Sequence, residues 1–138
     1  MPGFIRARAV TRHQVRQYLG KAEEFLAVAE DCLAAGRTTA ATGNAIHAAV
    51  SAGDVVCGAL TGERAAGLDH RQAGTLLTRC RPPGPEVAAY LGRLLPLKTK
   101  AEYEPADVPS GAAEKAVEWA RRSVALAGDL VAGMGADR

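Results

Sequence analysis

The stretch that decides the fold is TTAATGNAIHAAVSAGDVVCGAL, residues 38–60. Asp54 is its single charged residue in about six helical turns. We predict one helix at the centre of a bundle, because a helix at the surface carries charged residues along its outer face. Its glycines each cost about 1 kcal/mol relative to Ala in a helix interior, so their number predicts close packing of neighbouring backbones. These glycines are Gly43, Gly53 and Gly58, and the predicted apolar face consists of Ala45, Ala48, Ala49, Ala52, Val55, Val56, Ala59 and Leu60.

Four other parts of the chain have apolar residues at three- and four-residue steps, the spacing of one face of a helix. Gly36 is placed to end the first of these helices, and the short connection after it predicts an antiparallel neighbour. We therefore predict an all-α fold, an antiparallel bundle of four long helices and one short helix. It forms a single domain over residues 1–138, with its core at about residues 11–133. The predicted flanking helices cover residues 11–35, 69–80, 85–103 and 110–133.

Local signals refine the helix ends. Thr38 or Thr39 is expected to cap the central helix by accepting a hydrogen bond from a free backbone N–H. Residues 62–72, GERAAGLDHRQ, are predicted as a polar loop in which Asp69 caps the short helix. Pro96 is expected to kink or interrupt the helix over 85–103, because proline lacks the N–H that a helix interior needs.

Composition limits the function classes. The chain has 138 residues, 17 basic and 15 acidic, and aromatic residues make up 4%. A net charge of +2 without a dense basic stripe argues against duplex DNA as a partner. Cys32, Cys57 and Cys80 are far apart without a C-x-x-C pair, which argues against a disulfide framework and a thiolate zinc site and favours the reducing cytoplasm. No apolar run has the length of a signal peptide or membrane span, so we expect no membrane association.

Four polar residues form the most informative feature. Asn44, His47, Ser51 and Asp54 are spaced by three, four and three, so they line one stripe of the central helix. Burying such groups in the core costs a few kcal/mol each, so they are expected to face a partner, a cleft or water. The plainer interpretation is the solvent-facing strip of the helix. Against it, the solvated strips elsewhere in the chain use Glu, Arg and Lys, which favours a ligand or interface stripe.

Catalytic and metal chemistry receive little support from these residues. His47 and Asp54 lie about 10 Å apart along a helix, too far for a hydrogen bond. Ser51 lacks a recognisable base and oxyanion pocket. His13, His47 and His70 have no i, i+3 or i+4 spacing, and no Glu-x-x-His occurs, so no metal and no cofactor are predicted.

A second polar group precedes the last helix. LLPLKTKAEYE places Lys98, Lys100 and Tyr103 near a predicted helix end. Lysines there interact favourably with the partial negative charge of the helix C-terminus, which is the plainer interpretation. Alternatively, a lysine holds a phosphate as a point charge while Tyr103 stacks or hydrogen-bonds to the ligand.

Taken together, the order and spacing of five segments over about residues 18–133 resemble the HEPN domains, small helical proteins often encoded beside a minimal nucleotidyltransferase. Several HEPN relatives carry Arg-x-x-Ala-Asp-Tyr where this chain has Lys98, Ala101, Glu102 and Tyr103. The segments are YLGKAEEFLAVAEDCLAAG (18–36), AIHAAVSAGDVVCGAL (45–60), LDH (68–70), LKTKAEY (97–103) and ARRSVALAGDLV (120–131).

The resemblance implies a homodimer, often with polar clefts at its interface, and a place in a paired system such as toxin and antitoxin. It also implies, for some members, RNA cleavage without a metal, by an Arg followed four to six residues later by a His late in the bundle. No His follows His70 here, and Arg64 with His70 has the spacing but lies before the short helix.

Three functions follow as hypotheses. The first is a dimeric HEPN-type binding module for a nucleotide, RNA or a cognate nucleotidyltransferase, without hydrolytic chemistry of its own. The second is a diverged metal-independent ribonuclease toxin in which His47 or His70 acts as acid or base beside Lys98 on the same or the partner chain. The third is a helical adaptor whose Ala-rich surface mates with another helical protein.

Overall fold

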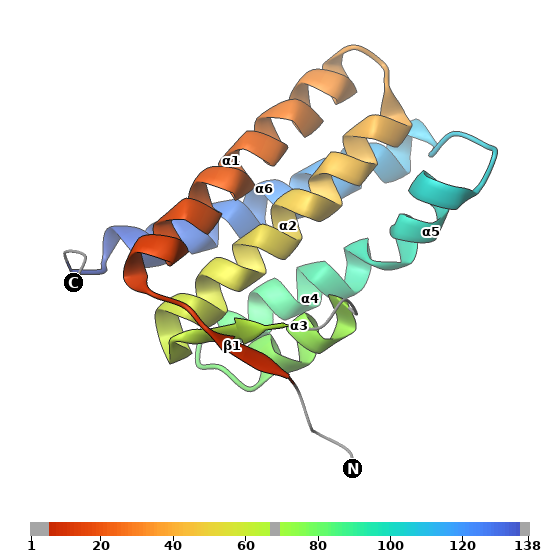
Figure 1. Cartoon of the computed structure of the whole chain (residues 1–138). Helices are drawn as coiled ribbons and strands as arrows, with labels where there is room; N and C mark the ends of the chain where they lie inside the picture. The colour runs from red at the N-terminus through yellow and green to blue at the C-terminus, as the bar shows by residue number, and fades with distance from the viewer. Residues whose placement is uncertain (1–5, 67–69, 136–138) are drawn as a thin grey trace.

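The computed structural model describes residues 6–66 and 70–135. Within them the protein is an all-α bundle with one small antiparallel sheet (Figure 1). This confirms the predicted fold class. The helices are α1 (Arg12–Ala34), α2 (Thr38–Thr61), α3 (His70–Thr78), α4 (Gly84–Leu94), α5 (Pro96–Tyr103) and α6 (Ser110–Ala132), and the strands are β1 (Ala7–Ala9) and β2 (Glu63–Ala65).

Helix α2 is the central element, as its low charge predicts. It runs antiparallel to α1 and packs against each of the other five helices and β2 (Figure 1). Most of its predicted apolar face is fully buried, from Ala45 to Val56, whereas Ala59 and Leu60 are half-buried. The apolar stripes of α1, α4 and α6 close the core around it, with Leu77, Leu91 and Leu94 the largest fully buried side chains.

The glycines of α2 have different roles. A Cβ at Gly53 would lie 3.1 Å from Leu77 Cδ1, and one at Gly58 would lie 2.7 Å from Val15 Cγ2. At these two positions the predicted close packing is correct. Nothing lies within 4 Å of a Cβ built at Gly43, so the prediction is wrong there. Gly43 instead leaves open the wall of a pocket described below.

The N-terminal ends of α1 and α2 differ in how they are capped. At α1, the Thr11 hydroxyl accepts from the Gln14 N–H, and the Gln14 side chain accepts from the Thr11 N–H. Both backbone N–H groups, which have no acceptor within the helix, are therefore hydrogen-bonded. At α2, the predicted Thr cap is wrong because Thr38 and Thr39 already lie inside the helix. Arg37 occupies the N-cap position and makes no side-chain capping bond. Gly36, at φ 76°, ends the α1 turn as predicted.

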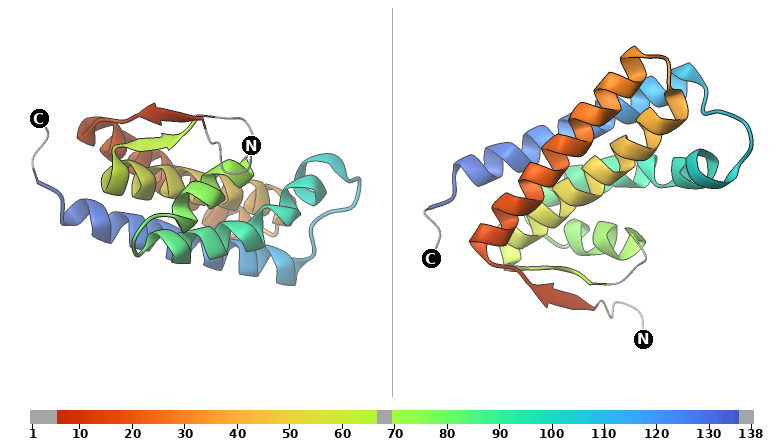
Figure 2. Two further views of the ribbon diagram at one scale, coloured as in Figure 1. Left: turned by 90° about the horizontal axis from the view of Figure 1, so that it is seen from below. Right: turned by 45° about the horizontal axis from the view of Figure 1, so that its top comes forward.

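The chain departs from the predicted elements in two places. The loop predicted at 62–72 contains β2, which pairs with β1 so that Arg64 lies opposite Arg8, and it also contains the start of α3. Strands of three residues are too short to show an alternating pattern, so the sequence gives no signal for them. The predicted cap Asp69 lies outside the described residues. Figure 2 shows the β1–β2 ribbon at one end of the bundle, beside the end of α2.

The predicted long helix over 85–103 is two helices, α4 and α5, that meet at Leu95 and Pro96. This confirms the expected interruption at Pro96. The bundle therefore has three long helices, and the fourth position is filled by two shorter helices in sequence. Because the chain turns at this junction, the end of α5 moves away from α4 and toward the first turns of α2 (Figure 2).

No helix of the described part is both long and apolar enough to cross a lipid bilayer.

Candidate functional site

The polar stripe of α2 divides between two environments. Asn44 and His47, in the N-terminal half, line a pocket of about 730 Å³. Asp54, in the C-terminal half, pairs with Arg64 from β2, with its side chain only 14% exposed. Ser51 lies between them, half-buried, and does not line the pocket.

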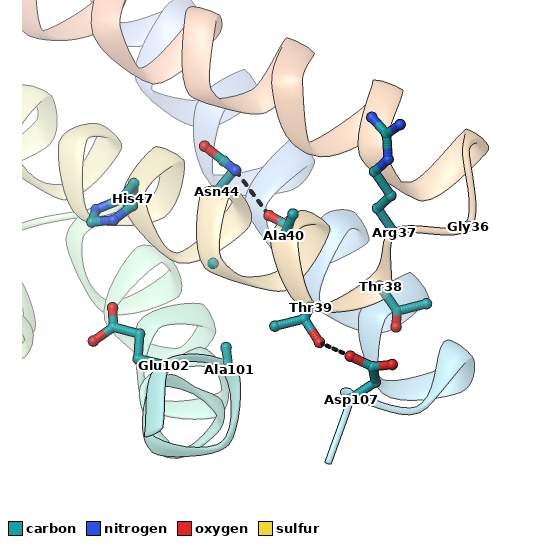
Figure 3. Close-up of a pocket in the computed structure, with 11 residues that line it drawn as sticks. Gly36, Arg37, Thr38, Thr39, Ala40, Asn44, His47, Ala101, Glu102 and Asp107 are labelled. Atoms are coloured by element: carbon teal, nitrogen blue, oxygen red, sulfur yellow. Dashed lines mark hydrogen bonds between the residues drawn. The ribbon is translucent and has the colours of Figure 1, made fainter. Parts of the chain in front are cut away.

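The pocket lies at the end of the bundle where four parts of the chain meet. Its walls are the α1–α2 turn with Arg37, the first three turns of α2, the end of α5 with Glu102, and the segment before α6 with Asp107 (Figure 3). These parts are far apart in sequence, so the pocket exists only in the folded bundle. Its volume falls within the range of about 300–1,000 Å³ that is typical of small-molecule sites.

A hydrogen-bond network fixes the wall formed by the segment before α6. The Thr39 hydroxyl donates to Asp107 Oδ1 at 3.1 Å and accepts from the Val108 N–H at 3.2 Å. Val108 itself is 1% exposed, so its apolar side chain anchors the segment in the core. The position of the Asp107 carboxylate beside α2 is therefore set by both polar and apolar contacts (Figure 3).

Asn44 and His47 are held by contacts within the bundle. Asn44 Nδ2 donates to the backbone oxygen of Ala40 at 2.9 Å, which leaves the amide oxygen of Asn44 as an acceptor for a ligand. The His47 ring lies against the Phe25 ring of α1, with centroids 5.3 Å apart and planes at 32°. Figure 3 shows the Glu102 carboxylate on α5 directed toward the side of the pocket where His47 lies.

Groups of both charges line the pocket. Arg37 carries a positive charge, and the uncapped start of α2 leaves backbone N–H groups without intrahelical acceptors. Two carboxylates also line it: Asp107, which accepts from the Thr39 hydroxyl in the first turn of α2, and Glu102 on α5. The pocket thus offers both donors and acceptors, together with the Asn44 amide and the His47 imidazole.

The other predicted site residues do not join this pocket. Lys98 and Lys100 are half-buried on α5, and Tyr103 is 73% exposed at its end, yet only Ala101 and Glu102 of that helix line the pocket. The side chain of His70 lies outside the described residues.

At the far end of the stripe, Asp54, Arg64 and Tyr18 form a second polar cluster. The Arg64 guanidinium lies 3.9 Å from Asp54 Oδ2 and 5.2 Å from the centre of the Tyr18 ring. Burial raises the pKa of Asp54 from 3.8 to about 6, and the positive charge of Arg64 only partly opposes this. The group is the one charge of α2, and β2 supplies its partner.

Sequence reasoning missed five polar residues of the pocket, namely Arg37, Thr38, Thr39, Glu102 and Asp107. Arg37 follows a glycine in a tight turn between long helices, a position that could have been marked as a helix start facing solvent. Asp107 gives no such signal, because it lies in an irregular segment whose path depends on the break at Pro96. Among the described residues, no group of three or more His, Cys, Asp or Glu side chains is arranged to hold a metal ion.

Neither a scan against protein-family models nor searches of curated proteins and of solved structures return a match to this chain.

Proposed function

We propose that the chain is a HEPN-type binding module that takes a nucleotide, free or as a unit of RNA, in the pocket at the start of α2. The observation that carries the proposal is the composition of this pocket. Polar side chains from four separate parts of the chain meet around about 730 Å³, and Asn44 and His47 of the α2 stripe are among them. The HEPN resemblance of the sequence is compatible with the bundle but is carried by the sequence alone.

The chemistry of the walls fits the two ends of a nucleotide. Arg37 and the uncapped N–H groups of α2 would hold a phosphate, since an arginine fork and a helix N-terminus both favour anions. Glu102 and Asp107 would accept hydrogen bonds from sugar hydroxyls or from an exocyclic amine of the base. The negative charge of Glu102 opposes a second phosphate on the α5 side, so the proposal favours one orientation of the ligand.

The proposal assigns binding and no hydrolysis to this site. Lys98 does not line the pocket beside His47 of the same chain, so the pocket gives no support to that pair acting within one chain. The proposal includes a homodimer and a nucleotidyltransferase partner, both of which come from the resemblance. Incubation of the pure protein with mixed RNA tests the hydrolytic alternative directly. Cleavage that disappears in His47→Ala would replace the binding proposal with the ribonuclease.

Isothermal titration calorimetry with the four nucleoside monophosphates and triphosphates tests the binding proposal. We expect at least one nucleotide to bind the wild type, and Arg37→Ala and His47→Ala each to weaken its affinity about tenfold or more, as loss of a charged or stacked contact does. Arg81→Ala is the matched control, because Arg81 is exposed before α4 and does not line the pocket. Affinity that is equal in all four proteins would reject this location.

The adaptor hypothesis instead makes a partner protein the ligand of the chain. If no nucleotide binds and the purified chain forms a stoichiometric complex with a nucleotidyltransferase encoded beside it, the nucleotide proposal is wrong and the interaction role replaces it.

A further inference from the structure

The outer strand of the β1–β2 ribbon has one edge without a partner. β2 packs against α2 and α3, whereas β1 is the outer strand and pairs with β2 (Figure 2). The register sets Arg8 opposite Arg64, and the hydrogen bonds two residues to either side make this a hydrogen-bonded pair. Because N–H and C=O groups alternate in direction along a strand, those of Ala7 and Ala9 point away from β2. They have no hydrogen-bond partner among the residues that the structure describes.

The strand that carries this edge is held at both ends. After β1, the Val10 N–H donates to the backbone oxygen of Gly62 at 2.8 Å. The Val10 side chain lies against α2, with its Cγ1 atom 3.4 Å from where a Gly58 Cβ would be. Before β1, the backbone oxygen of Arg6 accepts from the Ala66 N–H at 2.9 Å. The edge is therefore already extended and in place, which lowers the entropy cost of adding a further strand to it.

The ribbon belongs to a strongly basic part of the chain. The first acidic residue is Glu23, and the sequence before it contains Arg6, Arg8, Arg12, Arg16 and Lys21. The side chains of Arg6 and Arg8 are exposed and make no hydrogen bond or ion pair with the residues that the structure describes. Arg8 lies opposite Arg64, so two like charges face each other across the ribbon, and Asp54 pairs with Arg64. Uncompensated positive charge therefore remains beside the free edge.

We propose that the free edge of β1 docks an extended acidic segment of a partner protein, which adds a third strand to the ribbon and sets its carboxylates beside Arg6 and Arg8. Main-chain hydrogen bonds to Ala7 and Ala9 hold this strand. In antiparallel addition Arg8 falls in a non-hydrogen-bonded pair, in which facing side chains lie closest, at about 4.5 Å between Cα atoms. Arg6, two residues earlier, has its side chain on the same face. The partner strand therefore needs acidic residues at alternate positions.

Two other occupants fit this edge less well. A second copy of the chain would bring its own Arg6 and Arg8 against those of the first, which like-charge repulsion opposes. The phosphates of a nucleic acid accept hydrogen bonds, so they would leave the outward C=O groups of Ala7 and Ala9 unpaired. A peptide strand pairs with both the N–H and the C=O groups. Glu63 of β2 does not repel its carboxylates, because successive side chains alternate and Glu63 lies on the other face from Arg8.

The test uses the whole chain and a fluorescein-labelled synthetic heptapeptide in which glutamate alternates with valine and threonine. Fluorescence anisotropy at low ionic strength compares it with the same peptide carrying lysine in place of glutamate. We expect the glutamate peptide to bind and the lysine peptide not to bind. Arg6→Ala and Arg8→Ala should each weaken the affinity about threefold, and the double variant about tenfold, as the loss of exposed charge pairs does. Arg81→Ala is the matched control, exposed and outside the ribbon, and should bind like the wild type.

N-methylated peptides separate strand addition from attraction between charges. A methyl group on the amides between the glutamates, which face Ala7 and Ala9, should abolish binding. A methyl group on the glutamate amides, which point away from β1, should leave it intact. In backbone amide NMR, the N–H groups of Ala7 and Ala9 should shift and become protected from solvent exchange when the glutamate peptide is added.

Several results would overturn the proposal. These are equal binding of the glutamate and lysine peptides, no binding of either, equal sensitivity to both methylation patterns, or unchanged amides at Ala7 and Ala9. A uridine dodecamer that displaces the glutamate peptide from the wild type would make the edge a nucleic-acid surface instead. A dimer in which these two amides are protected without peptide would assign the edge to a second copy. The ribbon lies beside the end of α2 and the nucleotide pocket at its start, so the result is independent of nucleotide binding.

Discussion

Replacing Asp54 by Asn is expected to change how the stability of the protein depends on pH. The carboxylate is the one charge of α2, and burial raises its pKa to about 6. Its side chain is 14% exposed, and the Arg64 guanidinium lies 3.9 Å away, the outer limit of an ion pair. The Cys57 thiol is a further titratable neighbour, but its pKa is raised and it stays neutral through the acid range. The Asp54 carboxylate is therefore incompletely compensated when ionised.

The size of the change in stability follows from the pKa shift of Asp54. A pKa of about 6 in the folded protein, against 3.8 in the unfolded chain, is worth about 3 kcal/mol at about 1.4 kcal/mol per unit. The folded protein binds this proton more tightly than the unfolded chain does. The contribution of Asp54 to stability is thus fully present below pH 3.8 and is lost as the pH rises through 6. Linkage gives a loss of about 0.6 kcal/mol at pH 4 and about 2.9 kcal/mol at pH 7.

Urea unfolding followed by circular dichroism between pH 4 and pH 7 measures this. Asp54→Asn cannot ionise, so its free energy of unfolding should exceed that of the wild type by an amount that grows by about 2 kcal/mol over this range. Asp129→Asn, on the exposed face of α6, is the control and should follow the wild-type curve. A difference between Asp54→Asn and wild type that stays constant with pH would refute the reasoning. A variant that is less stable throughout would mean that the pair with Arg64 is net favourable.

Three further substitutions test the packing and the polar contacts. Gly84→Ala should destabilise the fold by about 1–3 kcal/mol, because the new Cβ would lie 2.5 Å from a backbone oxygen of α3. Gly92→Ala is the control: the space around it is open, so it should stabilise the fold by about 0.5–1 kcal/mol. Thermal unfolding measures both. Thr39→Val should lower the free energy of unfolding by about 1–2 kcal/mol and weaken the binding of any ligand of the pocket, because both hydrogen bonds to the segment before α6 are lost. Thr38→Val, at a pocket residue without such bonds, should lower it less in the same urea titration. Glu30→Gln breaks a surface ion pair with α6 and should cost less than about 1 kcal/mol, a loss that disappears when unfolding is repeated in high salt.

The bundle was predictable because its signals are local and repeated. A single charge in α2 requires a central position, and the apolar spacing of α1 and α6 gives their bounds within one or two residues. Pro96 marks the break between α4 and α5 by its missing N–H. The direction that the chain takes after this break is not a local property, and it decides which residues of α5 meet α2.

The candidate site was predictable only in its contribution from α2. The spacing of the stripe identified Asn44 and His47, but the pocket also needs Arg37 from a turn and Asp107 from an irregular segment. Irregular segments have no periodicity, so the sequence does not say which face they cover. For the same reason Lys98, chosen for its charge, lies outside the pocket that Glu102 of the same helix lines.

The division of the stripe explains why α2 uses short polar side chains. A helix that contacts every other helix is buried along most of its length, so a Lys or Glu on its core-facing positions would be buried. Where the pocket opens, the polar groups of α2 are an amide and an imidazole. At Asp54 a charge is kept, and the β1–β2 pairing holds Arg64 over it and over the Tyr18 ring. The small sheet, which no periodicity predicts, thus serves to bring a cation to the one charge of the central helix.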